Sequence, residues 1–388
     1  MNEGWKTARI GDLIVENPKS QLKVRDSISG GEYPFYTSGV SIYSCDDFLC
    51  DGKNLFIATG GKACIQYFEG KAAYSTDCYS FTTRADVTPK FLFYFLDSKL
   101  AEIEEHMFEG AALRHLQKAK FRELVAPLPP AVEQQRIAGV LDEAFAGLAI
   151  AEANAERNHR NAAALFERHL QSVFAQRGDG WVERTVAELV EEGALLKPFD
   201  GNHGEIHPKR TDYTESGVPF IMARDLQDGL VDTKHCIFIS RELADSLRVG
   251  FAKDGDVLVS HKGTIGRSAI VNTEDDYIML TPQVTAYRVK DSRKLFNRFV
   301  RYYFMSSGFQ REMIAGASDG STRAYIGITK QLTLRFRFPS LAEQKRIADE
   351  LDALCPETRR LAHLYARKRA AFAELKKSLL HQAFTGNL

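Results

Sequence analysis

One ten-residue phrase occurs twice in this chain and constrains its fold more than any other feature. Glu133–Asp142 reads EQQRIAGVLD and, 210 residues later, Glu343–Asp352 reads EQKRIADELD, with seven of ten letters identical. The apolar residues of both phrases recur at intervals of three and four, which predicts a helix. A phrase repeated at this distance indicates that a large unit of the chain is duplicated.

The duplication extends beyond the phrase in both directions. At the same offset the halves share identical residues, namely Gly110 and Gly320, Lys120 and Lys330, Pro129 and Pro339, and Phe174 and Phe384. The two beginnings also correspond, because GWKTARIGDL (4–13) resembles GWVERTVAEL (180–189) at an offset of 176 residues. The second globular part is therefore longer by about 34 residues, the difference between the offsets. We predict four parts, namely a globular segment at 1–130, a helix at 131–177, a second globular segment at 178–340 and a second helix at 341–388.

The two helical segments carry a narrow apolar seam with a period near 3.5 residues. The seam residues expected to pair are Ile137, Leu141 and Leu148 in one helix and Ile347, Leu351 and Leu361 in the other. Such a seam must be buried against another helix, and the nearest complementary seam is the duplicate. This predicts an antiparallel intramolecular coiled coil, with two amphipathic helices on separate cores as the alternative. Pro356 should kink or restart the second helix, because proline lacks an amide proton.

The globular segments are predicted to be of the α+β class. LFIATGG (55–61) and DVLVSHKG (256–263) each place a strand-forming run before a glycine turn. PKFLFYFLDSKLAEIEEHM (89–107) and RKLFNRFVRYYFMSSGFQREMI (293–314) are expected to be helices. The order of strands, helix and basic loop is then the same in both halves.

Charge and targeting signals narrow the function classes. Lys plus Arg and Asp plus Glu both number 51, so the net charge does not suggest a free-standing nucleic-acid-binding protein. Two stretches before the repeated phrases are nevertheless basic, because 110–124 has four cations and one acid and 320–338 has four cations and no acid. The chain shows no signal pattern and no apolar run of membrane-spanning length, and its six scattered cysteines are expected to be reduced thiols in the cytoplasm.

The chain resembles a known family, the specificity (S) subunits of type I restriction–modification enzymes. The resemblance rests on GVPFIMARDLQDG (217–229), GDVLVSHKGTIGRSAIV (255–271), LPPAVEQQRIAGVLD (128–142), FPSLAEQKRIADELD (338–352) and SLLHQAFTGNL (378–388). EYPFYTSGVSIYS (32–44) is a weaker version of the first motif. The resemblance implies two target-recognition domains that read the halves of a split sequence in double-stranded DNA, separated by two spacer helices. It implies two methyltransferase (M) subunits as partners, and restriction (R) subunits in the full complex, in a bacterial or archaeal host.

A duplicated chain suits a split target, because it gives one polypeptide a pseudo-two-fold axis. A helix of about 44 residues is roughly 66 Å long, and one turn of B-DNA is about 34–36 Å. The spacer is therefore expected to hold two readers about one to two DNA turns apart.

Two places in each half are expected to contact DNA. Glycine turns let the backbone approach phosphates, and Lys or Arg can pair with phosphate or bridge guanine acceptors. The glycine turns supply Lys62 in the first half and His261, Lys262, Thr264 and Arg267 in the second. The basic loops supply Arg114, His115, Lys118 and Lys120 in the first half and Arg323, Tyr325 and Lys330 in the second. The alternative for each cation is an ordinary solvated surface residue.

No catalytic residue, metal site or cofactor is predicted. Two other function classes stay open, a metal-dependent nuclease using Glu69 and Lys71 and a coiled-coil scaffold without a DNA role. The missing catalytic motifs favour the specificity subunit over the nuclease, and the duplicated basic loops favour it over the scaffold. His203 and His207 have a spacing that could bind zinc on a helix, but their flanking glycines and Pro208 predict a loop.

Overall fold

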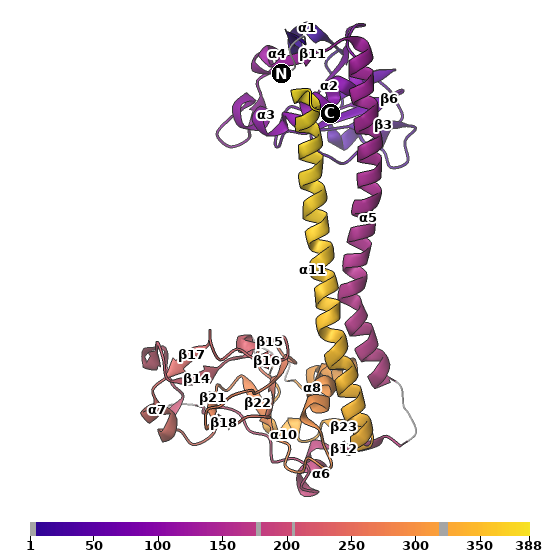
Figure 1. The fold of residues 1–388 in the computed structure, drawn as a ribbon. Helices are drawn as coiled ribbons and strands as arrows, with labels where there is room; N and C mark the ends of the chain where they lie inside the picture. The colour runs from indigo at the N-terminus through magenta and orange to yellow at the C-terminus, as the bar shows by residue number, and fades with distance from the viewer. Residues whose placement is uncertain (1–4, 176–179, 204–205, 318–324) are drawn as a thin grey trace. The chain divides into compact units, whose positions relative to one another are not determined.

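The computed structural model describes residues 5–175, 180–203, 206–317 and 325–388. The chain divides into two compact units, and each is described by itself. Unit 1 comprises residues 1–158 and 364–388, and unit 2 comprises residues 159–363. Each unit therefore contains one globular segment, one end of the first long helix and the opposite end of the second (Figure 1).

Unit 1 is a small α+β domain. Its four-stranded sheet has the order β2 (Ile14–Glu16), β8 (Cys78–Thr83), β5 (Lys53–Ala58), β6 (Ile65–Glu69). A three-stranded sheet has the order β4 (Tyr43–Cys45), β3 (Tyr33–Tyr36), β7 (Ala73–Tyr74), and β9 (Phe108–Glu109) pairs with β10 (His115–Leu116). The short helices are α1 (Ile10–Leu13), α2 (Pro89–Ser98), α3 (Leu100–Met107) and α4 (Lys118–Glu123). Leu55, Phe81 and Phe121 are fully buried in the main core of this unit.

Unit 2 is larger and has two five-stranded sheets. One has the order β13 (Tyr213–Thr214), β17 (Ile237–Ile239), β14 (Val218–Ile221), β21 (Ile278–Leu280), β18 (Phe251–Ala252). The other has the order β15 (Leu226–Gln227), β16 (Leu230–Val231), β20 (Ser268–Ile270), β19 (Val257–Ser260), β22 (Val284–Tyr287). The short helices are α6 (Val186–Glu191), α7 (Arg241–Ser246), α8 (Asn297–Met305), α9 (Ser307–Ala315) and α10 (Ile328–Gln331).

The first and last strands of each globular segment pair in the same way. In unit 1, β1 (Lys6–Arg9) runs antiparallel to β11 (Val125–Leu128). In unit 2, β12 (Val182–Thr185) runs antiparallel to β23 (Arg335–Phe338). Each pairing brings the start of a globular segment to the point where its long helix begins.

The long helices α5 (Ala131–Ala175) and α11 (Leu341–Thr385) run antiparallel in both units. In unit 1, Ile137 and Leu141 near the start of α5 share a cluster with Leu380 and Ala383 near the end of α11. In unit 2 the order is reversed, because Leu170 near the end of α5 shares a cluster with Ile347, Ala348 and Leu351. The predicted α+β class and the antiparallel pairing of two long helices are confirmed.

The expected seam residues divide between the two units. Ile137 and Leu141 lie in a different cluster from Ile347 and Leu351, and Leu148 and Leu361 are only half-buried. Along the middle of α5, Ala155 and Ala162 are buried, and Arg369 of α11 forms a 2.6 Å ion pair with Glu156. The expectation that Pro356 restarts the second helix is wrong, because α11 continues through it.

The repeated phrase fastens the start of each long helix to a globular domain. The buried amide side chain of Gln134 accepts a 2.7 Å hydrogen bond from the Thr88 amide, at the start of α2, and donates to the Pro129 carbonyl at 2.9 Å. Gln344 repeats this in unit 2, accepting from the Phe296 amide before α8 and donating to the Pro339 carbonyl, both at 3.0 Å.

The aspartate that ends each phrase completes the same joint. Asp142 accepts hydrogen bonds from Lys90 and Tyr94 of α2, both at 2.6 Å. Asp352 accepts from Arg298 and, at 2.5 Å, from Tyr302 of α8. The repeated phrase thus corresponds to a repeated contact, because each long helix packs on its globular domain through an equivalent glutamine and an equivalent aspartate.

Within the described residues, no helix combines the length and apolar character needed to span a bilayer.

Candidate nucleic-acid interface

The glycine turn and the basic loop of the first half lie side by side. Gly60 and His115 form an antiparallel bridge, the Gly61 amide donates to the Arg114 carbonyl at 3.2 Å, and the Leu116 amide donates to the Thr59 carbonyl at 2.9 Å. Two segments that are more than fifty residues apart in sequence thus form one surface. We call residues 59–62 with 114–118 the first turn–loop surface.

The second half brings its own turn and loop together in the same way. Lys262 and Tyr325 form an antiparallel bridge, and the Ile326 amide donates to the His261 carbonyl at 3.1 Å. The rings of His261 and Tyr325 meet edge to face at 5.3 Å. We call residues 261–267 with 325–330 the second turn–loop surface.

The predicted cations of the first half have different surroundings. Lys62, His115, Lys118 and Lys120 are all exposed. The Lys118 amine lies 4.1 Å from the centre of the Tyr79 ring, and partial burial lowers the pKa of this amine. Lys120 forms an ion pair with Glu109. Lys62, His115 and Lys118 therefore offer the most available polar groups of the first turn–loop surface.

The guanidinium of Arg114 is engaged within its own domain. It donates to the carbonyl oxygens of Glu105 at 3.1 Å and Phe108 at 2.7 Å, at the end of α3. A cation at this position satisfies helix carbonyls that otherwise lack partners, and it opposes the negative end of the helix dipole. The structure thus gives Arg114 a capping role, which sequence reasoning had not foreseen.

In the second half, Lys262, Thr264, Arg267 and Lys330 are exposed and Tyr325 is half-buried. The Lys262 amine lies 5.8 Å from the centre of the Tyr325 ring. Arg323 lies outside the described residues. Lys262 and Arg267 stand at the two ends of the turn that follows β19, where the Arg267 amide donates to the Ser260 hydroxyl at 2.9 Å.

His261 differs from the expectation, because its side chain is fully buried and presents no surface to DNA. Its Nδ1 lies 2.6 Å from the Thr285 hydroxyl and 2.8 Å from the Gln331 amide nitrogen. Its Nε2 lies 3.0 Å from the Pro282 carbonyl, to which it donates. Because an amide nitrogen only donates, Nδ1 is assigned as the acceptor and the ring as neutral.

The buried ring ties the second turn–loop surface to the sheet beneath it. Burial lowers the pKa of His261, while the Pro282 carbonyl and the Asp200 carboxylate, 3.8 Å away, oppose that shift in part. Gln331 also donates to the Ile326 carbonyl at 3.0 Å and accepts from the Tyr287 hydroxyl at 2.8 Å. His261 and Gln331 thus hold the turn and the loop in place from below.

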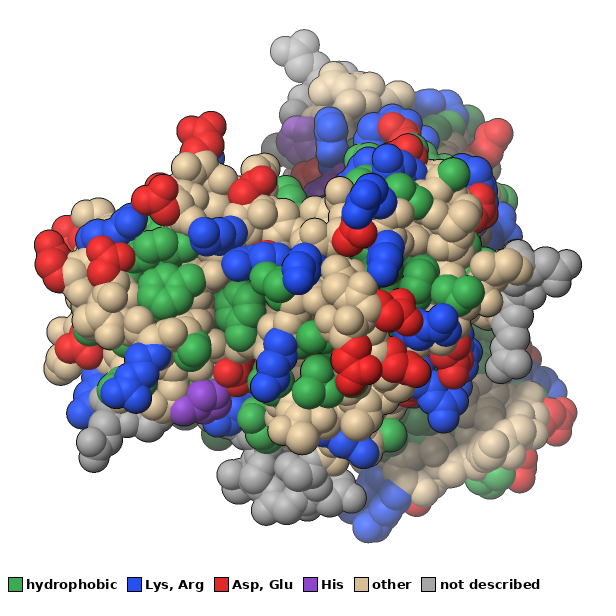
Figure 2. Space-filling model, turned by 90° about the horizontal axis from the view of Figure 1, so that it is seen from below, with side chains coloured by type: hydrophobic (Ala, Val, Ile, Leu, Met, Phe, Trp, Pro, Cys, Tyr) green, Lys and Arg blue, Asp and Glu red, His purple; other side chains and the backbone are tan. Residues whose placement is uncertain are grey.

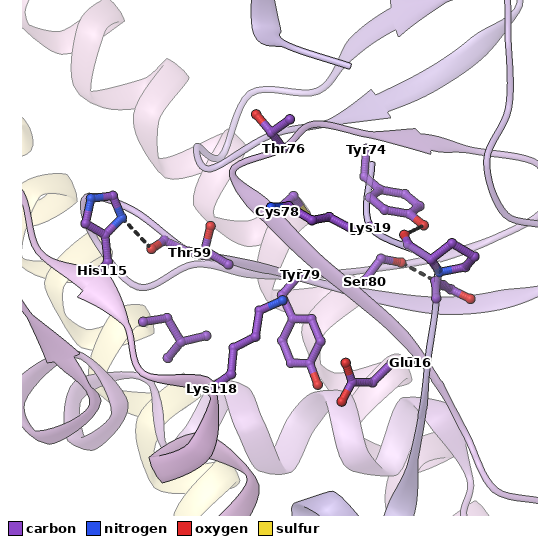
Figure 3. Close-up of a pocket in the computed structure, with 13 residues that line it drawn as sticks. Glu16, Lys19, Thr59, Tyr74, Thr76, Cys78, Tyr79, Ser80, His115 and Lys118 are labelled. Carbon is purple, nitrogen blue, oxygen red and sulfur yellow. Dashed lines mark hydrogen bonds between the residues drawn. The ribbon is translucent and has the colours of Figure 1, made fainter. Parts of the chain in front are cut away.

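A polar pocket of about 320 Å³ opens beside the first turn–loop surface (Figure 3). Its lining includes Glu16, Thr59, Tyr79, His115 and Lys118. Figure 3 shows the Lys118 amine beside the Tyr79 ring and the His115 ring hydrogen-bonded to the Thr59 carbonyl, at 3.3 Å. Sequence reasoning missed Glu16 and Tyr79, because they lie on β2 and β8, far from either basic cluster.

On the face shown in Figure 2, basic and acidic side chains are intermixed. In Figure 2, Lys and Arg side chains are spread over the visible face and alternate with Asp and Glu. Among the described residues, no group of three or more His, Cys, Asp or Glu side chains is placed to hold a metal ion. The residues of the nuclease alternative have separate partners, since Glu69 pairs with Lys53 at 3.7 Å and the Lys71 amine lies 4.6 Å from the Phe48 ring centre.

Comparison with known families identifies the class of protein. Residues 2–157 and 179–364 match the family described as "Type I restriction modification DNA specificity domain". The chain belongs to this family and carries two copies of its domain. The nuclease and scaffold alternatives receive no support from the match.

Relatives of known class resemble the chain over most of its length. It is 22% identical to the type I restriction enzyme MjaVIII specificity subunit of Methanocaldococcus jannaschii, over 100% of this chain and 93% of that protein. It is 21% identical to the EcoBI specificity subunit of Escherichia coli, over 95% of this chain and 79% of that protein.

Solved structures share the fold. A chain from a structural study of the assembly and conformational transition of the type I R-M system matches with a TM-score of 0.69 and 19% identity, covering 100% of this chain and 99% of that one. The HsdS subunit from Thermoanaerobacter tengcongensis matches with a TM-score of 0.63 and 19% identity, covering 100% and 98%.

Proposed function

We propose that this chain is the DNA-specificity subunit of a type I restriction–modification system and reads a bipartite target with its two globular domains. The observation that carries the proposal is the repeated turn–loop surface, which occurs once in each copy of the specificity domain. Each surface has two components. One is an exposed lysine in or directly after the glycine turn, and the other is an aromatic or imidazole ring from the basic loop. Lys62 and His115 form this pair in the first domain, and Lys262 and Tyr325 form it in the second.

The chain acts within a larger assembly and does no chemistry itself. We propose that it binds two methyltransferase subunits, and restriction subunits in the full complex. The duplicated helices support this, because a chain with two equivalent halves can present equivalent surfaces to two copies of a partner. Since the methyltransferase subunits would modify the cell's own DNA, the assembly would work in the cytoplasm of a bacterium or archaeon.

Co-expression with the methyltransferase encoded beside it tests this proposal. We expect the two proteins to co-purify and to methylate adenines in one split sequence, read out by sequencing of modified bases. Omitting this chain should abolish that pattern while the methyltransferase remains present. Sequence-independent methylation in both samples would refute a specificity role.

A further inference from the structure

One pocket in unit 2 is lined by several arginines. It has a volume of about 550 Å³ and lies between α8, the turn at Gly229 and the part of α11 around Pro356. Four arginines line it, Arg298, Arg301, Arg359 and Arg360, together with Asp228 and Asp352.

Three of the four arginines correspond to apolar residues in unit 1. The offset of 208 residues that aligns Lys90 and Tyr94 with Arg298 and Tyr302 places Phe93 opposite Arg301. The offset of 210 along the long helices places Ala149 and Ile150 opposite Arg359 and Arg360. Phe93 and Phe145 there pack on Tyr94 at ring distances of 5.1 and 5.3 Å. Arg301, Arg359 and Arg360 are therefore specific to the second half and are not needed for the helix joint that both halves share, whereas Arg298 takes the place of Lys90 in that joint.

Arg301 is the unusual member of the group. Its residue exposure is only 8%, and its Nε has no hydrogen-bond partner among the described residues. Its guanidinium lies 4.6 Å from the centre of the Tyr302 ring and donates to the Met305 sulfur at 3.6 Å, which is a weak acceptor. A Cβ at Gly229 would lie 2.0 Å from this guanidinium, and Gly229 has a φ of +85°, which favours glycine, so the turn passes directly beside Arg301.

The neighbouring arginines already have carboxylate partners. Arg298 pairs with Asp349 at 2.9 Å as well as with Asp352, Arg359 pairs with Asp228 at 2.8 Å, and Arg360 pairs with Glu357 at 2.9 Å. Among the described residues, no carboxylate lies within ion-pair distance of Arg301. A buried cation without an anion is costly, and a ligand that supplies the negative charge would remove that cost.

We propose that this pocket binds a phosphate-sized oxyanion, with Arg301 as its buried anchor and Arg359 at its mouth. The guanidinium fork suits a tetrahedral oxyanion, because its donors lie in one plane and can bind two oxygens together. Two ligands have this chemistry, namely a backbone phosphate of bound DNA and free inorganic phosphate.

Thermal unfolding of the full chain tests the site with inorganic phosphate as the probe, against chloride at matched ionic strength. Since phosphate also stabilises proteins without binding, the diagnostic result is a saturable rise in Tm that depends on Arg301. We expect the saturable rise in Tm in the wild type and in the control variant Arg293→Met. The Arg293 side chain is 88% exposed, pairs with Asp291 and does not line this pocket. Arg301→Met should lose it. An equal rise in all three proteins, or none, overturns the proposal.

Arg301→Met should also be at least as stable as the wild type without phosphate, because it removes an unpaired buried charge. If that variant does not fold, Arg359→Met decides the matter, since its side chain is half exposed. A several-fold higher phosphate concentration for half-saturation supports the site, and an unchanged concentration overturns it.

The salt dependence of DNA binding then separates the two sources. If the pocket holds a DNA phosphate, Arg301→Met reduces the slope of log K against log salt by about one unit. If the slope is unchanged while the phosphate-dependent Tm rise is lost, the site is one for free phosphate. The phosphate measurement does not depend on the DNA role, so failure of one proposal leaves the other testable.

Discussion

Individual side chains on the turn–loop surfaces separate into those that can reach DNA and those that hold the surface together. Lys62 and Lys262 are exposed and occupy corresponding turns, whereas Arg114 caps α3 and His261 is buried. Predictions for these residues therefore differ even though all four are basic and adjacent to the same surfaces.

Lys62→Ala and Lys262→Ala should each affect one half-site. If the lysine contacts a base, we expect a loss of about 1–3 kcal/mol and relaxed preference at one position. If it contacts only phosphate, binding should weaken on all sequences and the salt slope should fall by about one unit. The measurement is binding of the assembled enzyme to single-base target variants at two salt concentrations. Loss of preference in both half-sites from one substitution would contradict the two-reader proposal.

Arg114→Ala serves as the contrasting variant in the same experiment. Because its guanidinium binds the carbonyls at the end of α3, its loss should lower the stability of the first domain by about 1 kcal/mol. We expect half-site preference to remain at temperatures where the variant is folded.

His261 predicts acid sensitivity of the second domain. Its pKa in the folded protein lies below 6.5, so the unfolded chain binds a proton that the folded chain rejects. The contribution of the neutral ring to stability is complete above about pH 6.5. It is lost as pH falls from there toward the folded pKa. The nearby ionisable groups are Asp200, His203 and Lys262.

The measurement is Tm between pH 5 and pH 8 for the wild type and His261→Gln. The variant should be less stable at pH 8 and should lose less Tm on acidification. Parallel curves would show that His261 is not responsible for the dependence.

At the scale of secondary structure elements, the repeated phrase is a joint between a long helix and a globular domain. Gln134 and Gln344 each satisfy one amide and at least one carbonyl that would otherwise be buried without partners. These contacts explain why polar residues of the phrase, such as the glutamine and the final aspartate, are repeated as well as its apolar residues.

Gln344→Ala should therefore destabilise the protein far more than its neighbour Lys345→Ala. We expect a loss of about 1–3 kcal/mol for Gln344, because the Phe296 amide and the Pro339 carbonyl lose their partner. Lys345 is exposed and its replacement should be nearly neutral. Chemical denaturation of the two variants measures the difference, and similar losses would show that the buried amide contributes little.

The lengths of α5 and α11 lead to the spacer prediction. We consider a variant with seven residues inserted after Ala155 in α5 and seven inserted after Arg369 in α11. Insertions of seven residues preserve the heptad phase. The two insertions lie opposite each other, because Arg369 pairs with Glu156. Each insertion adds roughly 10 Å, or about three base pairs at 3.4 Å per pair. The modified-base pattern should show the same half-sites with a longer gap. An unchanged gap with methylation intact would refute a measuring role for the helices.

For the whole molecule, the proposed role requires partners for any chemistry. The isolated chain should show no DNA methylation, no DNA cleavage and no ATP hydrolysis. The assay uses the purified chain with plasmid DNA, divalent metal, ATP and a methyl donor, and Glu69→Ala as a comparison. Metal-dependent nicking by the wild type that disappears in Glu69→Ala would restore the nuclease interpretation.

The sequence by itself determined the duplication, the α+β class, the two long helices and the family, because periodicity and repeated letters are properties of the chain alone. It also placed the two basic clusters of each half, but as separate features. Only the tertiary structure decided that Gly60 meets His115 and that Lys262 meets Tyr325, since strand pairing joins residues whose separation leaves no local signal. The burial of individual side chains could not be predicted from the sequence either. His115 and His261 both lie in predicted DNA-contacting segments, but His115 is exposed and His261 is fully buried. Arg301 became significant only when folding placed it against Gly229 and beyond ion-pair distance of every described carboxylate, since the energy of a charge depends on its neighbours in space.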